Sequence, residues 1–237
     1  MVHAAAQHTA SRQPETVLGI VGLGTGNDFA TALGLATDLE AGLEQALGEP
    51  IAVDALSVGS SEARTDVSAS RPTWVTTVAT FGFSAQVNER AERMSFPRGS
   101  SRYTVATLLE TPKVASVAVE MSLDGSRSNH DVMMAAIANT AMFGGGMRIA
   151  PDASHSDGLL DVVLIGEVSR LTLLRVLPRA FSGGHVGHPA VSVSTGSWVE
   201  FAAEGSVRMR GDGEAVSQLP VRVELVKGAL LVAGANG

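Results

Sequence analysis

Short runs of apolar and β-branched residues follow one another from Ile51 to the end of the chain, with turn-forming residues between them. Strands at this spacing are typical of a β-sandwich or a barrel. One junction is explicit, because Asp124-Gly125 between two such runs is the dipeptide of a tight β-hairpin. Helical spacing interrupts the series at 87–109 and 169–181. The sequence therefore predicts a largely antiparallel β domain over residues 51–237.

A different pattern precedes this domain. Residues 17–23 form an apolar run, residues 22–30 read GLGTGNDFA, and helical spacing continues to Gly48. This order of strand, glycine-rich turn and helix leaves backbone N–H groups directed at an anion. A parallel strand needs neighbours that crossover connections supply, and no such unit precedes this one.

These two patterns predict an α+β fold and a division of the chain. We assign residues 1–16 to a loose tail and residues 17–50 to a remnant of an N-terminal α/β domain. Residues 51–237 are expected to form a C-terminal, β-rich domain with an antiparallel β-sandwich, and its last strand is a candidate to return to the first domain.

Composition excludes several classes of function. Apolar residues make up 45% of the 237 residues, enough for a substantial core, and the absence of cysteine excludes disulfides and thiolate metal sites. The net charge of −7 argues against broad attraction to nucleic acid or anionic lipid. No run approaches the roughly 20 apolar residues of a membrane span, and no secretory signal is recognisable, so a cytoplasmic protein is expected.

The glycine-rich turn is the first candidate site. By spacing alone, a phosphate-binding turn formed by Gly24, Gly26 and Asn27 and an ordinary turn are equally favoured. Asp28 sharpens the phosphate hypothesis, because a carboxylate repels phosphate unless a divalent cation lies between them. The alternative is that Asn27 and Asp28 cap the helix.

A second candidate site lies in the segment NTAMFGGGMRIAPDASHSDGLLDVVLI, residues 139–165. Three successive glycines permit close approach of another group, and the loop after them gathers oxygen ligands at Asp152, Ser154, Asp157 and Asp161. A calcium hand does not match, because Gly158 falls at the seventh position from Asp152 rather than the sixth. From the residues alone, an acidic turn is slightly favoured over a looser cation site.

A third candidate is MRGDGEA, residues 209–215. Asp212-Gly213 is a hairpin turn that requires no chemistry, and the residues alone favour that interpretation. The functional alternative is Glu214, a carboxylate held on a tight turn and suited to act as a general base.

Taken together and in this order, LGTGNDFATALGL, TFGFSAQV, GGGMRIAPDASHSDGLLDVVLI and GDGEA resemble the soluble diacylglycerol kinase-like lipid kinases of bacteria. The resemblance runs from residue 17 to the C-terminus. It implies that residues 17–50 are the remnant of an α/β domain, similar to that of NAD kinase, that binds ATP, a nucleotide-binding domain. It also implies that residues 51–237 are a lipid-binding domain whose β-sandwich shapes a lipid cleft. The implied reaction transfers the γ-phosphoryl group of ATP to a lipid hydroxyl, converting diacylglycerol to phosphatidic acid with Mg²⁺.

The resemblance also implies residue roles. Gly24, Thr25, Gly26 and Asn27 form the nucleotide-binding turn, in which Thr25 touches the nucleotide, and Asp28 orders water around the catalytic magnesium. Glu214 matches the carboxylate that takes the proton of the attacking hydroxyl. Ser154, Asp157 and the backbone carbonyl of Leu159 match a structural magnesium site. Because Asp28 and Glu214 come from opposite ends of the chain, a cleft between domains is their expected meeting place.

Two departures from the family pattern matter. Ser84 stands where the family usually has aspartate, and the nucleotide motif Gly-Gly-Asp-Gly-Thr does not occur upstream of residue 17. We therefore expect an N-terminally truncated kinase that binds ATP weakly by itself, with exposed apolar surface next to the first strand.

Two other functions stay open at this point: a non-catalytic lipid- or partner-binding remnant of such a kinase, and a relative of NAD kinase. The expected partners are the lipid substrate at a membrane surface, a second copy in a homodimer, and the missing N-terminal segment. Nucleic acid is not expected. The expected location is the cytoplasm, peripheral to the membrane.

Overall fold

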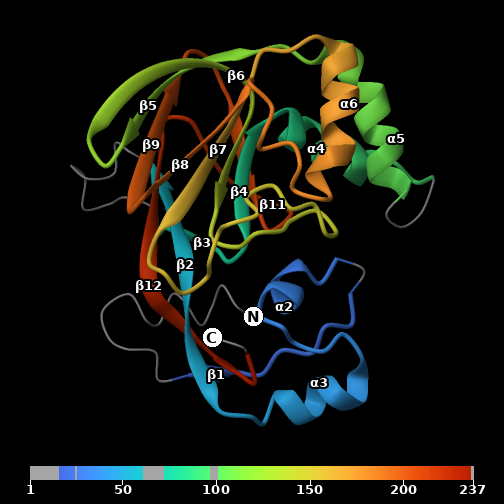
Figure 1. Ribbon diagram of the computed structural model, residues 1–237, viewed down its shortest axis with the longest axis vertical. Helices are drawn as coiled ribbons and strands as arrows, with labels where there is room; N and C mark the ends of the chain where they lie inside the picture. Colours follow the sequence, from blue (N-terminus) through green and yellow to red (C-terminus); the bar gives the residue numbers. More distant parts are fainter. Residues whose placement is uncertain (1–15, 25, 61–71, 97–100, 236–237) are drawn as a thin grey trace.

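The computed structural model describes residues 16–24, 26–60, 72–96 and 101–235 (Figure 1). The fold is α+β, with a large, mostly antiparallel sheet and few helices. The strands are β1 (Val17–Leu18), β2 (Pro50–Ser60), β3 (Thr73–Val75), β4 (Val78–Gly82), β5 (Val117–Leu123), β6 (Ser126–Ala138), β7 (Leu160–Gly166), β8 (Val191–Gly196), β9 (Trp198–Ala203), β10 (Arg208–Gly211), β11 (Glu214–Gln218) and β12 (Val221–Ala233). The helices are α2 (Asp28–Ala32), α3 (Leu39–Gln45), α4 (Phe83–Arg93), α5 (Ser101–Glu110), the short 3-10 helix η2 (Thr111–Lys113) and α6 (Arg170–Ala180).

The strands form one continuous hydrogen-bonded sheet in the order β11-β10-β4-β6-β5-β9-β12-β2-β3, with β7 and β8 added beyond β6. Between the described strands every pairing is antiparallel except that of β1 with the end of β12, where Val17 lies opposite Leu231. The sheet curls on itself, so that its inner face encloses a core. Phe81 of β4 and Phe201 of β9 meet there edge to face, with ring centroids 5.0 Å apart.

Helices α4, α5 and α6 cover the outer face of β4, β6 and β7 (Figure 1). A second core fills this layer, in which Phe83 of α4 and Leu173 of α6 pack with Met134 of β6. The helix predicted at 169–181 is confirmed, and Ser169 caps it by accepting a hydrogen bond from the backbone N–H of Thr172. The helical window at 87–109 contains two helices, α4 and α5, rather than one.

The N-terminal unit packs below the sandwich, where Leu33, Val53 and Leu230 share a third core. Two predictions for it are wrong in extent. The strand expected at 17–23 is regular only at Val17–Leu18. The helix expected to reach Gly48 is divided into α2 and α3, because Gly34 adopts a left-handed conformation (φ 68°) that ends the first helix.

The hairpin predicted at Asp124-Gly125 is confirmed as the turn between β5 and β6. Among the described residues, no helix combines the length and the apolar character that a membrane crossing requires.

Candidate functional site

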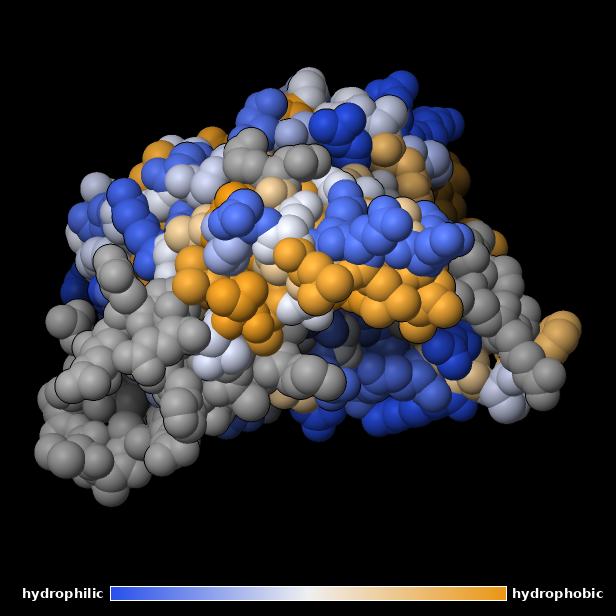
Figure 2. Space-filling view, turned by 90° about the horizontal axis from the view of Figure 1, so that it is seen from below, coloured by the Kyte–Doolittle hydropathy of each residue, from blue (hydrophilic) through white to orange (hydrophobic). Residues whose placement is uncertain are grey.

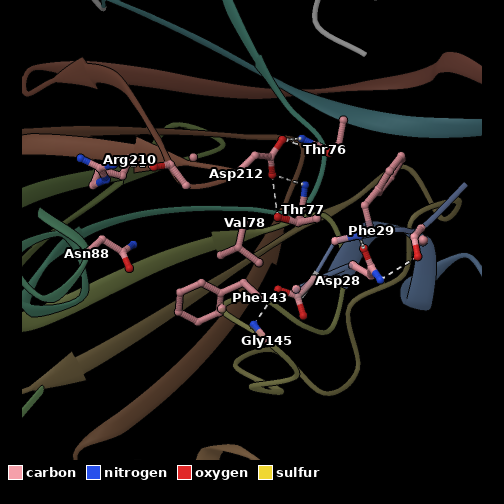
Figure 3. Close-up of a pocket in the computed structure, with 18 of the residues that line it drawn as sticks. Asp28, Phe29, Thr76, Thr77, Val78, Asn88, Phe143, Gly145, Arg210 and Asp212 are labelled. Atoms are coloured by element: carbon pink, nitrogen blue, oxygen red, sulfur yellow. Dashed lines mark hydrogen bonds between the residues drawn. The ribbon is translucent and has the colours of Figure 1, made fainter. Parts of the chain in front are cut away.

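A cleft of about 560 Å³ lies between the N-terminal unit and the sandwich. Three glycine-containing segments far apart in sequence contribute to its lining (Figure 3). They are the glycine-rich turn (described residues 22–24, 26 and 27), the triple-glycine loop (residues 144–146, of which 144 and 145 line the cleft) and the GDGE turn (residues 211–214, of which 211–213 line it). Helix α4 contributes Asn88, α5 contributes Arg102, and the β3–β4 connection contributes Thr76 and Thr77. The fold thus brings the glycine-containing parts of all three candidate motifs to one cavity, whereas Glu214 and the predicted ligands Ser154, Asp157 and Leu159 are not among the described residues that line it.

Asn27 holds the glycine-rich turn in shape. Its Nδ2 donates to the carbonyl of Gly22 and its Oδ1 accepts from the N–H of Gly24, both at 3.0 Å. Asn27 occupies the N-cap position of α2 in a left-handed conformation (φ 50°), but its side chain does not cap the helix. The capping role considered for Asn27 is therefore wrong for its side chain, which stabilises the turn instead.

Asp28 joins the glycine-rich turn to the triple-glycine loop. Its two carboxylate oxygens accept hydrogen bonds from the N–H groups of Gly145 at 2.8 Å and Gly146 at 2.7 Å. Both glycines have positive φ values, 86° and 96°, so their backbone shape disfavours any residue with a side chain. An ionised carboxylate has about four acceptor positions, so these bonds leave some of them for water or a cation.

Asp212 joins the GDGE turn to the β3–β4 connection. Its carboxylate accepts four hydrogen bonds, two from Thr76 (N at 2.7 Å, Oγ1 at 2.9 Å) and two from Thr77 (N at 2.9 Å, Oγ1 at 2.6 Å). Asp212 has a φ of 51°, a conformation that aspartate tolerates better than most residues.

A buried polar network lies behind these threonines. Asn139, fully buried, donates from Nδ2 to the carbonyls of Asp54 at 2.8 Å and Thr76 at 2.9 Å. Asp54 is only 4% exposed, and its carboxylate accepts hydrogen bonds from the N–H groups of Gly158 and Gly228, both at 2.8 Å. The cleft wall, the loop at 154–159 and β12 are therefore linked by hydrogen bonds.

Glu214 begins β11, directly after the cleft-lining residues Gly211 to Gly213, and its side chain is exposed. Arg210 precedes this turn and lines the cleft, and its guanidinium donates to the Gly213 carbonyl and pairs with Glu92 of α4. The GDGE turn is thus held from both sides, by Arg210 and by Asp212.

The predicted metal loop contains oxygen donors of the kind that a hard cation prefers. The Ser154 hydroxyl lies 3.4 Å from that of Ser156, and Asp157 accepts from the N–H of Leu159 at 2.9 Å. Burial, followed by the charges of Asp157 and Asp152, raises the pKa of Asp161 to about 6. Among the described residues no three His, Cys, Asp or Glu side chains are arranged to hold a metal, so a cation here would depend on hydroxyl and carbonyl oxygens.

Of the predicted nucleotide residues, Gly24, Gly26, Asn27 and Asp28 line the cleft, and Thr25 lies outside the described residues. Ser84, on α4, has a buried hydroxyl without a hydrogen-bond partner. Sequence reasoning missed the roles of Asp212, Thr76, Thr77 and Arg210. The sequence contained one signal for them, since an aspartate between two glycines is suited to a left-handed turn, but its threonine partners are about 135 residues away.

Comparisons with known proteins show which family and fold this chain resembles. The model of the YegS C-terminal NAD kinase beta sandwich-like domain matches residues 77–234, and that of the diacylglycerol kinase catalytic domain matches residues 1–58. A protein named diacylglycerol kinase from Mycobacterium tuberculosis strain H37Rv is 36% identical over 216 residues, which are 91% of this chain and 68% of that protein. A protein named "Probable lipid kinase YegS-like" from Yersinia enterocolitica is 27% identical over 215 residues, 90% of this chain and 68% of that protein.

A solved structure of a diacylglycerol kinase from Bacillus anthracis strain Sterne has a TM-score of 0.71 to this chain. The alignment covers 99% of this chain and 74% of that one at 16% sequence identity, so it establishes a common fold.

Proposed function

Because this chain belongs to the family of diacylglycerol kinase-like lipid kinases, we propose that it takes part in ATP-dependent transfer of a phosphoryl group to a lipid hydroxyl, converting diacylglycerol to phosphatidic acid. The observation that carries this proposal is the meeting of the glycine-rich turn, the triple-glycine loop and the GDGE turn around one cleft. Phosphoryl transfer needs positioning and charge stabilisation more than covalent chemistry, and a cleft lined by glycines, which let a phosphate approach the backbone closely, suits that need.

In the proposed reaction the lipid hydroxyl oxygen attacks the γ-phosphorus of ATP. A new oxygen–phosphorus bond forms, the bond to the bridging β,γ-oxygen breaks, and ADP leaves with the displaced electron pair. Glu214 accepts the hydroxyl proton and later releases it to solvent. Its exposed position beside the cleft-lining glycines is compatible with this role, because a base must be reached by its substrate.

Mg²⁺ is the divalent cation that we propose for this site, where it would neutralise charge on the phosphate oxygens. Asp28 is the residue proposed to hold it through water, and the acceptor positions left by its two backbone hydrogen bonds support that assignment. Ser154, Asp157 and Leu159 are proposed to hold a second, structural cation. The oxygen donors gathered in this loop, the Ser154 hydroxyl and the Asp157 carboxylate, support that assignment.

We further propose that a segment bearing the Gly-Gly-Asp-Gly-Thr motif, which does not occur in these 237 residues, completes the ATP site. An apolar band crosses the end of the molecule that bears β1 and α3 (Figure 2). Leu39, Leu43 and Leu47 are all exposed there, the last by 89%. Leu39 and Leu43, four residues apart, lie along one side of α3, and Leu47 follows its C-terminus. These exposed leucines support a protein partner for this surface.

The lipid surface is the partner that we propose for α6. Leu171 is 66% exposed and Phe181 is also exposed, while the opposite face packs into the core. Successive residues of an α-helix are 100° apart around its axis, so Leu171 lies on the helix surface between Arg170 on one side and Arg175 and Arg179 on the other. All three arginines are exposed. An apolar stripe flanked by arginines suits the headgroup region of an anionic bilayer, even though the whole chain carries a net charge of −7.

The test of the kinase assignment is Glu214→Gln, measured as ATP-dependent phosphorylation of dispersed diacylglycerol in the presence of the proposed N-terminal segment. Loss of the proton acceptor should reduce kcat by about a hundredfold or more and leave the Kd for ATP nearly unchanged. Glu204→Gln, which changes an exposed carboxylate away from the cleft-lining residues, is the matched control and should keep the wild-type rate. Full activity of Glu214→Gln would contradict the base assignment.

The same assay without the segment separates the kinase from a non-catalytic lipid-binding protein. The proposal expects little phosphorylation from the 237-residue chain alone and restored phosphorylation when the segment is supplied. Lipid binding without phosphorylation in both cases would favour the non-catalytic alternative.

A further inference from the structure

The carboxylate of Asp212 links the GDGE turn to the β3–β4 connection. It bonds to the backbone N–H and the hydroxyl of both Thr76 and Thr77, so two consecutive residues of the β3–β4 connection donate to one side chain. All of these distances lie between 2.6 and 2.9 Å. Hydrogen bonds to an ionised acceptor are about twice as strong as neutral ones, so this contact holds the turn firmly.

The structure assigns to Asp212 the role of a positioning residue: it sets the location of Glu214 relative to the cleft by holding the GDGE turn against Thr76 and Thr77. This inference rests on the proposed function, because it names the support of the proposed base. Asp212 itself is not proposed to exchange a proton with the substrate, since its acceptor positions face the threonines (Figure 3).

The surroundings of the turn explain why one side chain has this influence. On one side, Gly211 pairs with Ala79 of β4, and a Cβ on Gly211 would come within 2.3 Å of the Val75 side chain. On the other side, Gly213 has a φ of 86° and Glu214 begins a strand whose register to β10 shifts between Met209 and Arg210. The turn is therefore anchored to β4 before Asp212. After Asp212, the hydrogen bond from Arg210 to the Gly213 carbonyl and the pairing of Gly211 with Glu214 carry the position that Asp212 sets on to Glu214.

The threonines are themselves held in place. Asn139 donates to the carbonyl of Thr76 and, through its own N–H, to that of Thr77 at 2.9 Å. Asn139 is fully buried and also donates to the carbonyl of Asp54. A turn bonded to such a support is pre-organised, and a misplacement of about 1 Å at a reacting group costs about a hundredfold in rate.

The chain offers a matched control at its other Asp-Gly hairpin. Asp124 has a φ of 48°, precedes a glycine with positive φ, and accepts from the backbone N–H groups of Ser197 and Trp198 at 3.0 and 3.1 Å. It lies at the β5–β6 turn and is not among the residues that line the cleft. Asp124→Asn therefore reproduces the structural cost of removing a carboxylate from such a turn without touching the site.

The experiment compares Asp212→Asn with Asp124→Asn in the kinase assay described above and in amide hydrogen exchange of the protein without substrates. An amide at position 212 has one acceptor oxygen and turns an N–H₂ group toward the threonine donors. We expect kcat to fall by about tenfold to a hundredfold with less than about a threefold change in KM for ATP. We also expect faster exchange of the Glu214 and Ala215 N–H groups. Asp124→Asn should leave kcat and the exchange at residues 214 and 215 unchanged.

A second pair of variants covers the case in which Asp212→Asn does not fold. Thr77→Val removes the hydroxyl donor at nearly constant shape and should reproduce a partial loss of kcat, whereas Thr77→Ser keeps the hydroxyl and should restore it. In the Glu214→Gln background, Asp212→Asn should cause little further loss, because a residue acting through Glu214 has nothing left to position.

Equal kcat for Asp212→Asn and wild type, or equal losses for Asp212→Asn and Asp124→Asn, would overturn the positioning role. Failure of the proposed function gives a different pattern: Glu214→Gln would keep its activity. In that case the exchange of the turn amides still decides whether Asp212 holds the turn.

Discussion

At the scale of single residues, aspartate carboxylates repeatedly join distant segments through backbone N–H groups. Asp28 bonds to the triple-glycine loop, Asp54 to Gly158 and Gly228, and Asp212 to the β3–β4 connection, each across more than 100 residues of sequence. A carboxylate accepts two donors at once, so one such side chain fixes two loops relative to each other. Much of the candidate site is therefore held together by aspartate carboxylates that accept hydrogen bonds from other parts of the chain.

A buried histidine provides a test by pH at this scale. His185 is fully buried, donates from Nε2 to the Ile149 carbonyl at 3.0 Å, and has no hydrogen-bond partner at Nδ1. Burial lowers its pKa below the usual 6.5, although the bond to Ile149 opposes this effect. The unfolded chain therefore takes up the proton more readily than the folded protein. The stabilisation is complete above about pH 6.5 and is lost as the pH falls below it.

We expect wild-type protein to lose more free energy of unfolding between about pH 7.5 and about pH 5.5 than His185→Gln does, by up to about 1.4 kcal/mol per pH unit. Urea denaturation at several pH values measures this difference. The raised pKa of Asp161, about 6, has the opposite effect on the pH dependence of stability. Because Asp161 is present in both proteins, its contribution cancels in the difference between wild type and His185→Gln. His188→Gln, a change at a half-buried residue, serves as the control, and identical pH dependences for His185→Gln and wild type would contradict the prediction.

At the scale of elements, the cap of α6 can be tested directly. Ser169 has an extended backbone conformation, and its Oγ accepts from the N–H of Thr172 at 3.1 Å. Ser169→Ala leaves that N–H without its partner and should lower the free energy of unfolding by about 1 kcal/mol. Ser169→Asp keeps an acceptor and adds a favourable charge at the helix N-terminus, so it should restore the loss. Denaturant midpoints with unchanged m-values provide the measurement.

The elements also separate what sequence can predict from what it cannot. The β5–β6 hairpin and α6 were predictable, because Asp124-Gly125 and the Ser169 cap are local signals. The short β1 was not, because strand length depends on neighbours, and among the described strands β1 has β12 alone. The three candidate motifs were recognisable as separate turns. Their arrangement around one cleft depends on non-local strand pairing, such as that of β10 with β4, which no short stretch of sequence encodes.

At the scale of the whole molecule, two exposed apolar helix faces differ in charge. Exposed Glu40 and Glu44 accompany the leucines of α3, whereas arginines flank Leu171 on α6. We expect the 237-residue chain to sediment with vesicles of phosphatidylcholine and phosphatidylglycerol through α6. Arg175→Glu should weaken this binding by fivefold or more, since one basic residue near an anionic surface contributes about 1 kcal/mol. Leu171→Asp should reduce it further.

Leu43→Asp on α3 is the control for nonspecific adsorption of an apolar surface. It should leave vesicle binding unchanged and reduce any self-association seen by analytical ultracentrifugation, because it places a third negative charge beside Glu40 and Glu44. Equal effects of Leu43→Asp and Leu171→Asp on vesicle binding would mean that charge does not distinguish the two faces.

Strand β12 runs from the sandwich into the N-terminal unit, pairing with β9 along its first part and with β1 at its end. Its regular pairing with β2 is interrupted between Val226 and Leu230, where Gly228 adopts a φ of 57° and donates to Asp54. If the cleft opens, the N-terminal unit moves relative to the sandwich and β12, which runs through both, must bend. At the interruption β12 can bend without breaking a regular hydrogen bond to β2. We therefore expect domain closure to hinge at Gly228, with Asp54 setting the resting angle.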